Sequence, residues 1–600
     1  MQTTPSTRRL VRQLAETSDL DGFLAANRHR FAPETVAELK DEVDRLVKVD
    51  LTRAEPLAAA TRRLAVVLDD PVSLGYGDAA IAQVHHYAGR LTDAEPLYLA
   101  AIGRLRGAKR RVEAAALGRQ LVGLYMRQGR VEEALDVARR ARRTLKRAGE
   151  HALLGQLENN VGTIYYYTLV RYRTALAHLD RAHAHFQAAG DERSIAVVDY
   201  NRANVLLELD RPYEALELFE SAERVQSAAG NAIFATQCSY MIAFALATLG
   251  RYGEALKRYY SARERFLEIG DTRSAAWTAA YLAELHVRLN VVTEADEMAR
   301  TAVDEFSALD EQDAEVARAL VTRAKVLERR RQFKDAWAEV RRAQETFDRL
   351  GLTVLGGDAR LSQAELALES GDAATAASLA AEAGRIFGRA RLGGRRARAR
   401  IVEASAVRGL GETGRALRLA RSARAAAVIA TDPWTECRAE ELVGELELDR
   451  GRESDGIAAL ERAIAGIERL RMRLRPGEIR AAFLGDKLRS YERLVALYLA
   501  RGDADSLGRA FRYVEMAKSR ALADLMAQQL SSSRPDVKRE NRVREQLSRR
   551  LEDLNWYRSR IDQHDEKGGQ RNQRLDAHFR SELARCERDL ASLFHRLEAE

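Results

Sequence analysis

The sequence has 600 residues, with 97 Lys or Arg against 89 Asp or Glu, and a formal net charge of +8. Charged residues make up 31% of the chain and aromatic residues 6%, a composition typical of a long helical protein. Three widely spaced cysteines argue against a disulfide framework or zinc knuckle, and no stretch approaches the roughly 20 apolar residues of a membrane span. We therefore expect a soluble, cytoplasmic chain without a metal or cofactor.

In chain order, residues 1–35 are predicted to form an N-terminal helical cap, and residues 36–470 a regular array. Within the array an alanine recurs every 40 or 41 residues: Ala54, Ala94, Ala134, Ala175, Ala215, Ala255, Ala295, Ala336, Ala376 and Ala416, with Gly456 in phase. A second alanine stands seven residues after each of these positions from Ala94 onward: Ala101, Ala141, Ala182, Ala222, Ala262, Ala302, Ala343, Ala383, Ala423 and Ala463. A fixed period of this length is the signature of a solenoid.

Each unit of the array is predicted to hold two amphipathic helices around a turn. The predicted turns fall at Val49, Gly89, Gly129, Val170, Asp210, Gly250, Asn290, Arg331, Gly371, Gly411 and Gly451. Gly, Asn and Asp readily take the left-handed conformation that ends a helix, so Val170 and Arg331 are departures, and the period slips to 41 there. Another small residue precedes most turns by seven positions, as Ala203 and Ala243 do, which favours close approach of the two helices.

This spacing resembles the tetratricopeptide repeat (TPR), in a long-helix variety with a period near 40, over about eleven units. The resemblance implies an all-α superhelical solenoid in which the first helix of each unit lines a concave groove and the second forms the outer wall. It also implies that the partner is a protein or peptide held in that groove.

The most suggestive polar residues are asparagines on predicted first helices. Asn160, Asn204 and Tyr240 fall on the first helices of three consecutive units, and Asn201 lies beside Asn204. An Asn amide pairs with both the N–H and the C=O of an extended backbone. We therefore predict peptide contacts at Asn160, Asn201, Asn204 and Tyr240; the alternative is that these amides cap local hydrogen bonds or face water.

Residues 471–530 are predicted to form terminal TPR-like helices that end in the block E-x-A-K-S-R-x-L-x-D-L, which begins at Glu515. This block resembles the end of the repeat array in bacterial TPR–CHAT proteins, whose next element is a caspase-like protease domain. The resemblance implies the sensor or regulatory part of such a protease system, with Glu515, Lys518 and Arg520 as a coupling motif between array and effector.

Residues 531–600 begin with a breaker, Ser531–Pro535, and then carry leucines at heptad-like spacing, which predicts an antiparallel helical hairpin or coiled coil. In the TPR–CHAT family the protease domain would begin shortly afterwards. We therefore expect a truncated chain that lacks this effector and is itself no enzyme.

The charge is uneven along the array. From Arg385 to Arg424 there are twelve arginines against two glutamates, with a predicted basic patch at Arg395, Arg396, Arg398 and Arg400. Three interpretations of such a stretch are possible: a helix face that is exposed to solvent, a surface that binds an acidic partner, or a surface that binds nucleic acid. The alternative function is therefore a bacterial TPR-type, signal-responsive transcriptional regulator or nucleic-acid-associated adaptor, although no helix-turn-helix or ATPase module is visible.

Overall fold

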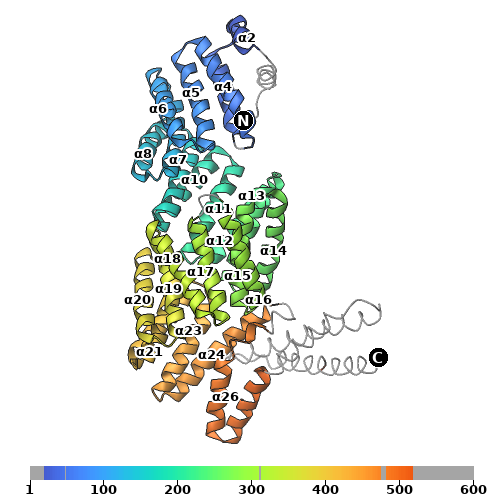
Figure 1. Ribbon diagram of the computed structural model, residues 1–600, viewed down its shortest axis with the longest axis vertical. Coiled ribbons are helices and arrows are strands. Elements are labelled where there is room, and N and C mark those ends of the chain that lie inside the picture. The colour runs from blue at the N-terminus through green and yellow to red at the C-terminus, as the bar shows by residue number, and fades with distance from the viewer. Residues whose placement is uncertain (1–18, 48, 310–312, 475–481, 518–584, 586–600) are drawn as a thin grey trace, which may run out of the picture. The chain divides into compact units, whose positions relative to one another are not determined.

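The computed structural model describes residues 19–47, 49–309, 313–474, 482–517 and 585, and throughout these ranges the regular secondary structure is helical (Figure 1). None of the described helices is long and apolar enough to cross a membrane. The elements are α2 (Leu20–Ala26), η1 (Arg28–Arg30), α3 (Pro33–Leu46), α4 (Leu51–Leu68), α5 (Pro71–Tyr87), α6 (Leu91–Gly107), α7 (Arg111–Arg127), α8 (Val131–Ala148), α9 (His151–Thr163), η2 (Ile164–Thr168), α10 (Tyr172–Ala189), α11 (Glu192–Glu208), α12 (Pro212–Ala228), α13 (Ala232–Thr248), α14 (Tyr252–Ile269), α15 (Thr272–Arg288), α16 (Val292–Ser307), α17 (Asp313–Arg329), α18 (Phe333–Arg349), α19 (Thr353–Glu369), α20 (Ala373–Ala390), α21 (Gly393–Gly409), α22 (Thr413–Ile429), α23 (Pro433–Asp449), α24 (Glu453–Met472) and α26 (Arg489–Arg501).

The chain forms two compact units. Unit 1 comprises residues 1–209 and 214–238, and unit 2 comprises residues 210–213 and 239–600. Both are built from the same helical hairpins, in which an odd-numbered first helix, such as α5 or α15, is followed by an even-numbered second helix. The fold is thus an all-α, TPR-like helical-repeat solenoid, as the sequence predicts.

The predicted turns are left-handed. Ten of the eleven predicted turn residues, all except Val49, have φ between +51° and +84°. A backbone bond closes the end of the first helix at turns such as Gly250, where Arg251 N–H donates to the carbonyl of Leu246 at 2.8 Å. Val170 and Arg331 adopt this conformation too, with φ of +51° and +59°, although a β-branched residue such as Val170 is strained there.

A π-helical turn accounts for one of the two slips in the period. Residues Ile164–Thr168 form η2 directly after α9, at the unit whose alanine spacing is 41. A π-turn absorbs one extra residue without breaking the helix. The insertion therefore leaves the buried alanines on both sides in place.

Both alanine series are buried. Every member lies on a second helix with at most 5% of its surface exposed, and most are at 0%. At Gly456 even a methyl group would not fit, because a Cβ there would lie 2.6 Å from Cγ of Leu448 and 3.0 Å from the carbonyl oxygen of Gly444. The series therefore records the positions where neighbouring helices approach most closely.

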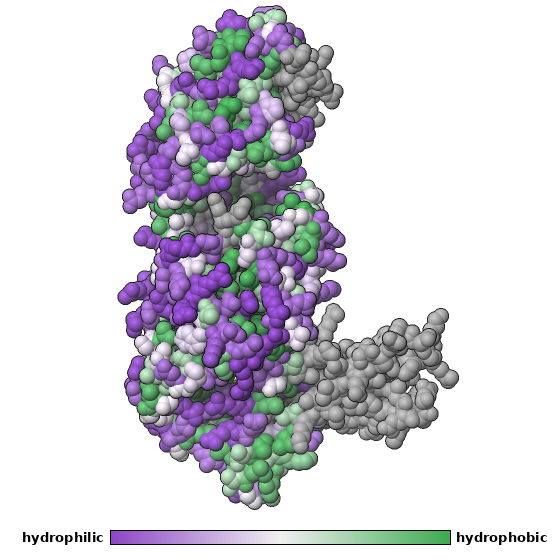
Figure 2. All heavy atoms as spheres, in the orientation of Figure 1, coloured by the Kyte–Doolittle hydropathy of each residue, from purple (hydrophilic) through white to green (hydrophobic). Residues whose placement is uncertain are grey.

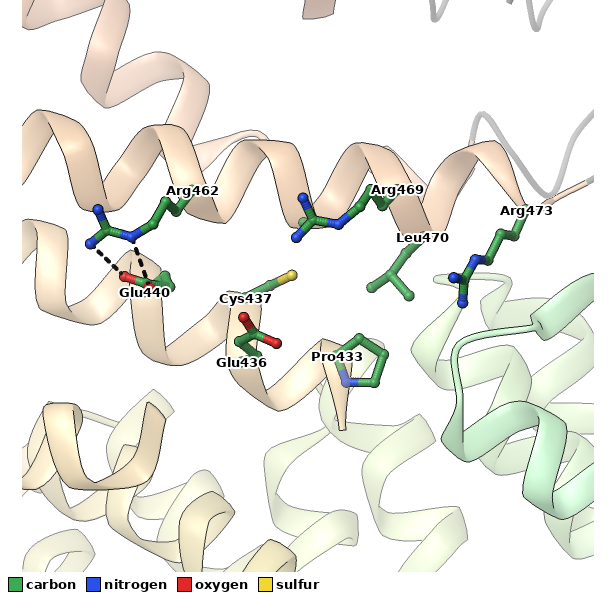
Figure 3. A pocket seen from close by; sticks show the side chains of 9 residues that line it. Pro433, Glu436, Cys437, Glu440, Arg462, Arg469, Leu470 and Arg473 are labelled. Carbon is green, nitrogen blue, oxygen red and sulfur yellow. Dashed lines mark hydrogen bonds and ion pairs between the residues drawn. The ribbon is translucent and has the colours of Figure 1, made fainter. Parts of the chain in front are cut away.

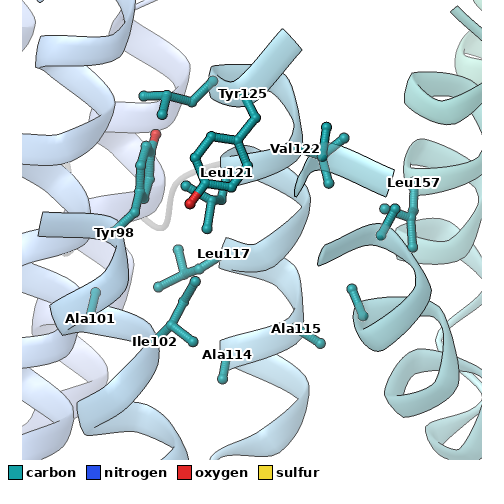
Figure 4. Close-up of a cluster of buried hydrophobic side chains, with 14 of the residues drawn as sticks. Tyr98, Ala101, Ile102, Ala114, Ala115, Leu117, Leu121, Val122, Tyr125 and Leu157 are labelled. Carbon is teal, nitrogen blue, oxygen red and sulfur yellow. The ribbon is translucent and has the colours of Figure 1, made fainter. Parts of the chain in front are cut away.

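Larger apolar side chains fill the space between the small ones. In unit 1, Tyr98 and Ile102 of α6 pack against Leu117 and Leu121 of α7 (Figure 4). Tyr98 is fully buried, and its hydroxyl donates to the side chain of Gln83. Each repeat thus buries its apolar face against the next one, as a stack without a closed core requires.

In unit 2, turns that follow first helices meet chain segments about five repeats later. Oδ2 of Asp210 accepts the N–H of Gly394, 184 residues away, at 2.9 Å. A Cβ on Gly250 would lie 2.3 Å from Cδ2 of Leu470, and Nδ2 of Asn290 donates to the carbonyl of Ala482 at 3.1 Å. We refer to this line of contacts, Asp210–Gly394, Gly250–Leu470 and Asn290–Ala482, as the seam.

Cationic side chains reinforce the seam at helix C-termini. Arg473 donates to the carbonyl of Leu249 at 3.0 Å, and Nζ of Lys487 donates to the carbonyl of Arg288 at 3.2 Å. A cation at the C-terminal end of a helix is stabilised by the helix dipole. The seam therefore joins polar, charged and apolar contacts between segments that are far apart in the chain.

Candidate binding face of the first helices

The first helices lie on the inside of the repeat stack. In unit 2, α15 contacts α17, α17 contacts α19, α19 contacts α21 and α21 contacts α23, whereas the described second helices from α14 to α24 make no comparable contact with one another. We refer to this side of the first helices as the inner face. Side chains at equivalent positions of successive repeats lie next to one another on it.

Aromatic rings gather on the inner face of unit 2. Tyr240 of α13 lies 5.6 Å from Tyr281 of α15, and Trp277 lies 6.0 Å from Tyr281, between ring centroids. The Arg318 guanidinium stacks over Trp277 at 4.5 Å and donates to the Tyr281 hydroxyl at 3.2 Å. The rings are half-buried, so part of this surface reaches solvent.

Charged side chains lie beyond these rings, around Glu284 of α15. Burial opposes the ionisation of Glu284, but cations outweigh it and lower its pKa; in order of effect they are Lys325, Arg288, Arg398 and Arg318. The side chains of Glu284 and Arg288 are 34% and 21% exposed, and that of Arg398 is 43% exposed. These groups therefore come together from α15, α17 and α21 without being sealed from water.

The sign of the charge reverses toward the C-terminal ends of α17 and α19. Burial, then Glu365 and to a lesser extent Glu369 raise the pKa of Glu328 to about 7, although Arg329 and Lys325 lower it. The inner face of unit 2 is thus cationic at one end and acidic at the other.

The predicted asparagine cluster lies in unit 1, and its members differ in role. Nδ2 of Asn201 on α11 donates to Oδ1 of Asn159 on α9 at 2.9 Å and bridges two first helices. Asn160 is half-buried on α9. Asn204 is only 6% exposed and donates to the carbonyl of Tyr200 on its own helix at 3.0 Å, so its amide is engaged locally rather than presented to a ligand.

The fourth predicted contact, Tyr240, belongs to unit 2. Its ring packs against Tyr259 at 6.1 Å and Phe266 at 6.4 Å as well as Tyr281. Tyr240 is therefore part of the aromatic group on the inner face.

The four arginines of the predicted basic patch point to two sides of α21. Arg395 pairs with Asp358 at 3.3 Å and Arg398 lies 3.8 Å from Asp432, both toward first helices. On the other side Arg400 donates to the hydroxyl of Ser422 on α22 at 2.5 Å, while the Arg396 guanidinium lies against α20. They do not form one continuous patch, because residues three or four apart share a face of a helix and adjacent residues do not.

At the C-terminal end of the array, Glu515 lies on a helical segment, residues 504–517, and is exposed. Lys518, Arg520 and, apart from residue 585, the predicted hairpin of residues 531–600 lie outside the described residues. Figure 2 shows an apolar surface at the C-terminal end of the array. Leu499 on α26, and Leu507 and Phe511 on residues 504–517, are 55%, 45% and 66% exposed. Leu507 and Phe511 thus lie on the same helical segment as Glu515.

The two described cysteines are structural. Burial raises the pKa of the Cys238 and Cys437 thiols to about 12, so both stay protonated at neutral pH. Cys437 lines a small pocket between α23 and α24, beside the bidentate pair of Arg462 and Glu440 at 3.0 Å (Figure 3). A Cβ on Gly466 would lie 2.3 Å from the Cys437 sulfur, so the thiol fills the space that this glycine leaves.

One residue that the sequence does not reveal is Lys487. It is 3% exposed, and burial lowers its pKa to about 8 despite the adjacent Asp486. Its ammonium lies 4.9 Å from the Trp434 ring and 4.4 Å from the Phe483 ring. Its acceptor, the carbonyl of Arg288, is 199 residues away, a separation that no local motif reports.

Comparisons of the sequence with protein-family models and with curated proteins gave no match. Solved structures of TPR-type proteins resemble the chain. A Rap protein complexed with competence and sporulation factor is 14% identical, with 74% of this chain and 100% of that chain covered and a TM-score of 0.44. A STAND protein with a TPR sensor from Pyrococcus horikoshii is 16% identical, with coverages of 57% and 52% and a TM-score of 0.40. Yeast Tom70 is 13% identical, with coverages of 76% and 97% and a TM-score of 0.32. Likenesses this distant carry no argument about function.

Proposed function

We propose that this chain is a cytoplasmic scaffold that binds a protein or peptide on the inner face of its first helices. The observation that carries the proposal is the group of Tyr240, Trp277, Tyr281 and Arg318, half-buried side chains contributed by three consecutive first helices. Trp, Tyr and Arg supply most of the binding energy in protein interfaces. A solenoid presents such residues over a long, continuous surface.

The asparagines add a polar component to this proposal. Asn160 and Asn201 remain proposed ligand contacts in unit 1, and Tyr240 in unit 2. Because an amide offers both a donor and acceptors, Asn160 is suited to pair with the backbone of an extended peptide. Asn204 is left out, since its amide donates within its own helix.

Selection of peptides from a random library against the whole chain tests the proposal. Trp277→Ala and Tyr281→Ala are each expected to lower the affinity for the selected peptides by about thirtyfold, the effect of removing an interface hot spot. The matched control is Tyr213→Ala, because this ring is 59% exposed on the second helix α12. Equal affinity for the inner-face variants, the control and the unmodified chain would reject the inner face as the binding surface.

We further propose that the array is the sensor or regulatory part of a TPR–CHAT caspase-like system. The support is the E-x-A-K-S-R block that begins at Glu515, together with the exposed apolar side chains of Leu499, Leu507 and Phe511 in the residues that precede it. Glu515, Lys518 and Arg520 would then couple the array to a protease domain. Sequencing the gene beyond codon 600 tests this, because finding no downstream His/Cys domain would remove the link.

A further inference from the structure

The cations around Glu284 outnumber the carboxylates that could neutralise them. Arg288 lies 3.7 Å from Glu284, the closest approach that a cation makes to this carboxylate in an ion pair of the described structure. The neighbouring carboxylate, Asp432, caps α23: its oxygens accept the N–H of Thr435 at 3.0 Å and its hydroxyl at 2.6 Å. Asp358 acts on Arg318 and Asp432 also acts on Arg288, so three carboxylates, Glu284, Asp358 and Asp432, face the four cations Arg288, Arg318, Lys325 and Arg398.

Two of these cations have donors to spare. Nε of Arg398 is buried without a hydrogen bond, and its nearest carboxylate oxygen, on Asp432, is 3.8 Å away. Lys325 forms no hydrogen bond or ion pair with any described residue; it is held between the fields of Glu284 and Glu328. A charged donor that is partly removed from water gains most from a charged acceptor.

The surroundings favour a peptide over a nucleic acid as the source of that acceptor. The Arg318 guanidinium covers the Trp277 ring at 4.5 Å, so this face is not open to a stacking base. The acidic group of Glu328, Glu365 and Glu369 at the other end of the inner face would repel an uninterrupted row of phosphates. A peptide places its acidic residues at the cations and neutral or basic residues beyond them.

We propose that Arg288, Arg318, Lys325 and Arg398 form the recognition site for an acidic peptide segment on the inner face of unit 2. The inference rests on the proposed peptide-binding function and specifies the class of its ligand. Glu284 occupies the site as an internal counter-charge that an incoming carboxylate must compete with. Removing this competitor should therefore strengthen binding, whereas removing the cations should weaken it.

Fluorescence anisotropy with the whole chain tests the assignment. The probes are a fluorescein-labelled decapeptide of alternating Glu and Gly, its Gln and Lys counterparts, and a single-stranded DNA oligonucleotide. We expect the unmodified chain to bind the Glu peptide more tightly than the other probes. The Lys325→Gln/Arg398→Gln double variant should bind the Glu peptide about tenfold more weakly than the unmodified chain does, and Glu284→Gln should bind it several-fold more tightly. Arg341→Gln, an exposed arginine on the second helix α18, should bind like the unmodified chain.

The gain with Glu284→Gln keeps the test informative, since misfolding does not raise affinity. Unchanged binding to the double variant, or tighter binding of the DNA through the same residues, would overturn the inference. If peptides bind regardless of charge and only Trp277→Ala or Tyr281→Ala weakens them, the proposed function stands and the acidic specificity falls. If no peptide binds at all, both fall.

Discussion

Units 1 and 2 share one repeat but neutralise their buried charge differently. In unit 1, Glu158 is 1% exposed and is closed in by Arg142 at 2.5 Å, His178 at 2.7 Å and Arg181 at 3.2 Å, all within adjacent hairpins. In unit 2, Glu284 faces cations from three first helices and stays 34% exposed. The buried alanines are common to both units, so the repeat specifies the scaffold while the polar positions decide what each region does.

The largest effect is expected from breaking the closed cluster of unit 1. Burial opposes the charge of Glu158, but the hydrogen bond with His178 and the cations Arg142 and Arg181 prevail and lower its pKa. Glu158→Gln should cost about 3 kcal/mol, because it weakens a fully buried acceptor on which three charged donors converge. Glu284→Gln should change stability by less than about 1 kcal/mol, since its cations reach water. Urea unfolding followed by hydrogen exchange measures the stability of each variant. Equal losses of stability in the two variants would contradict the proposed difference between the units.

The pH dependence of that cluster follows from the lowered pKa. A carboxyl whose pKa is lowered by folding stabilises the protein above its unfolded value of about 4.5, and this contribution is lost as the pH falls through the folded value. The stability gap between the unmodified chain and Glu158→Gln should therefore narrow in acid.

Substitution of two glycines distinguishes the free-energy cost of crowding the seam from the cost of straining a left-handed turn. Gly129 in unit 1 and Gly250 in unit 2 both have φ of +73°, but only at Gly250 would a Cβ meet other atoms. Gly129→Ala should cost about 1–2 kcal/mol through backbone strain alone. Gly250→Ala should lower the free energy of unfolding by this strain and by about 1–3 kcal/mol more, because the added methyl group overpacks against Leu470. Equal melting-temperature shifts for the two variants would argue against a close-packed seam.

Stability measured as a function of pH tests the acidic group at the C-terminal ends of α17 and α19. The pKa of Glu328, raised to about 7, means that its contribution to stability is present below about 4.5 and lost as the pH rises through about 7. Glu328→Gln should therefore be more stable than the unmodified chain by about 2 kcal/mol at pH 8 and of similar stability near pH 5. A stability difference that does not change with pH would contradict the raised pKa.

The smallest effect isolates one hydrogen bond of the seam. Asn290→Gly keeps a residue suited to the left-handed turn, φ +61°, and removes only the bond to Ala482, which should cost about 1 kcal/mol. Lys109→Gly in unit 1, at φ +62°, removes no such bond and should be neutral or stabilising. Amide hydrogen exchange of residues 482–488 measures the difference: exchange should become faster in Asn290→Gly and stay unchanged in Lys109→Gly.

The sequence predicts the scaffold well because the scaffold is local. Buried alanines and left-handed turns recur within one hairpin, so the period exposes them, down to the unusual turn residues Val170 and Arg331. The split of Arg395 and Arg398 from Arg396 and Arg400 also follows from helix geometry and needs only the rotation per residue. These features depend on spacing alone.

The inner-face chemistry depends on more than spacing. The approach of Arg398 to Glu284 and of Lys487 to Arg288 depends on how small rotations add up over several repeats, which residue types do not report. For Asn204 the difficulty is different: its amide is equally suited to a ligand or to its own helix, and only the structure shows the bond to Tyr200.

The seam also sets an order of events during synthesis. Each hairpin has its neighbour within reach as soon as it leaves the ribosome, but Asp210 waits for Gly394, 184 residues later. At about 5–20 residues per second, that delay is roughly 10–40 s. The hairpins in between have time to stack while the two edges of the seam are still apart. A ligand present during translation therefore meets the inner face of unit 2 before the seam has joined.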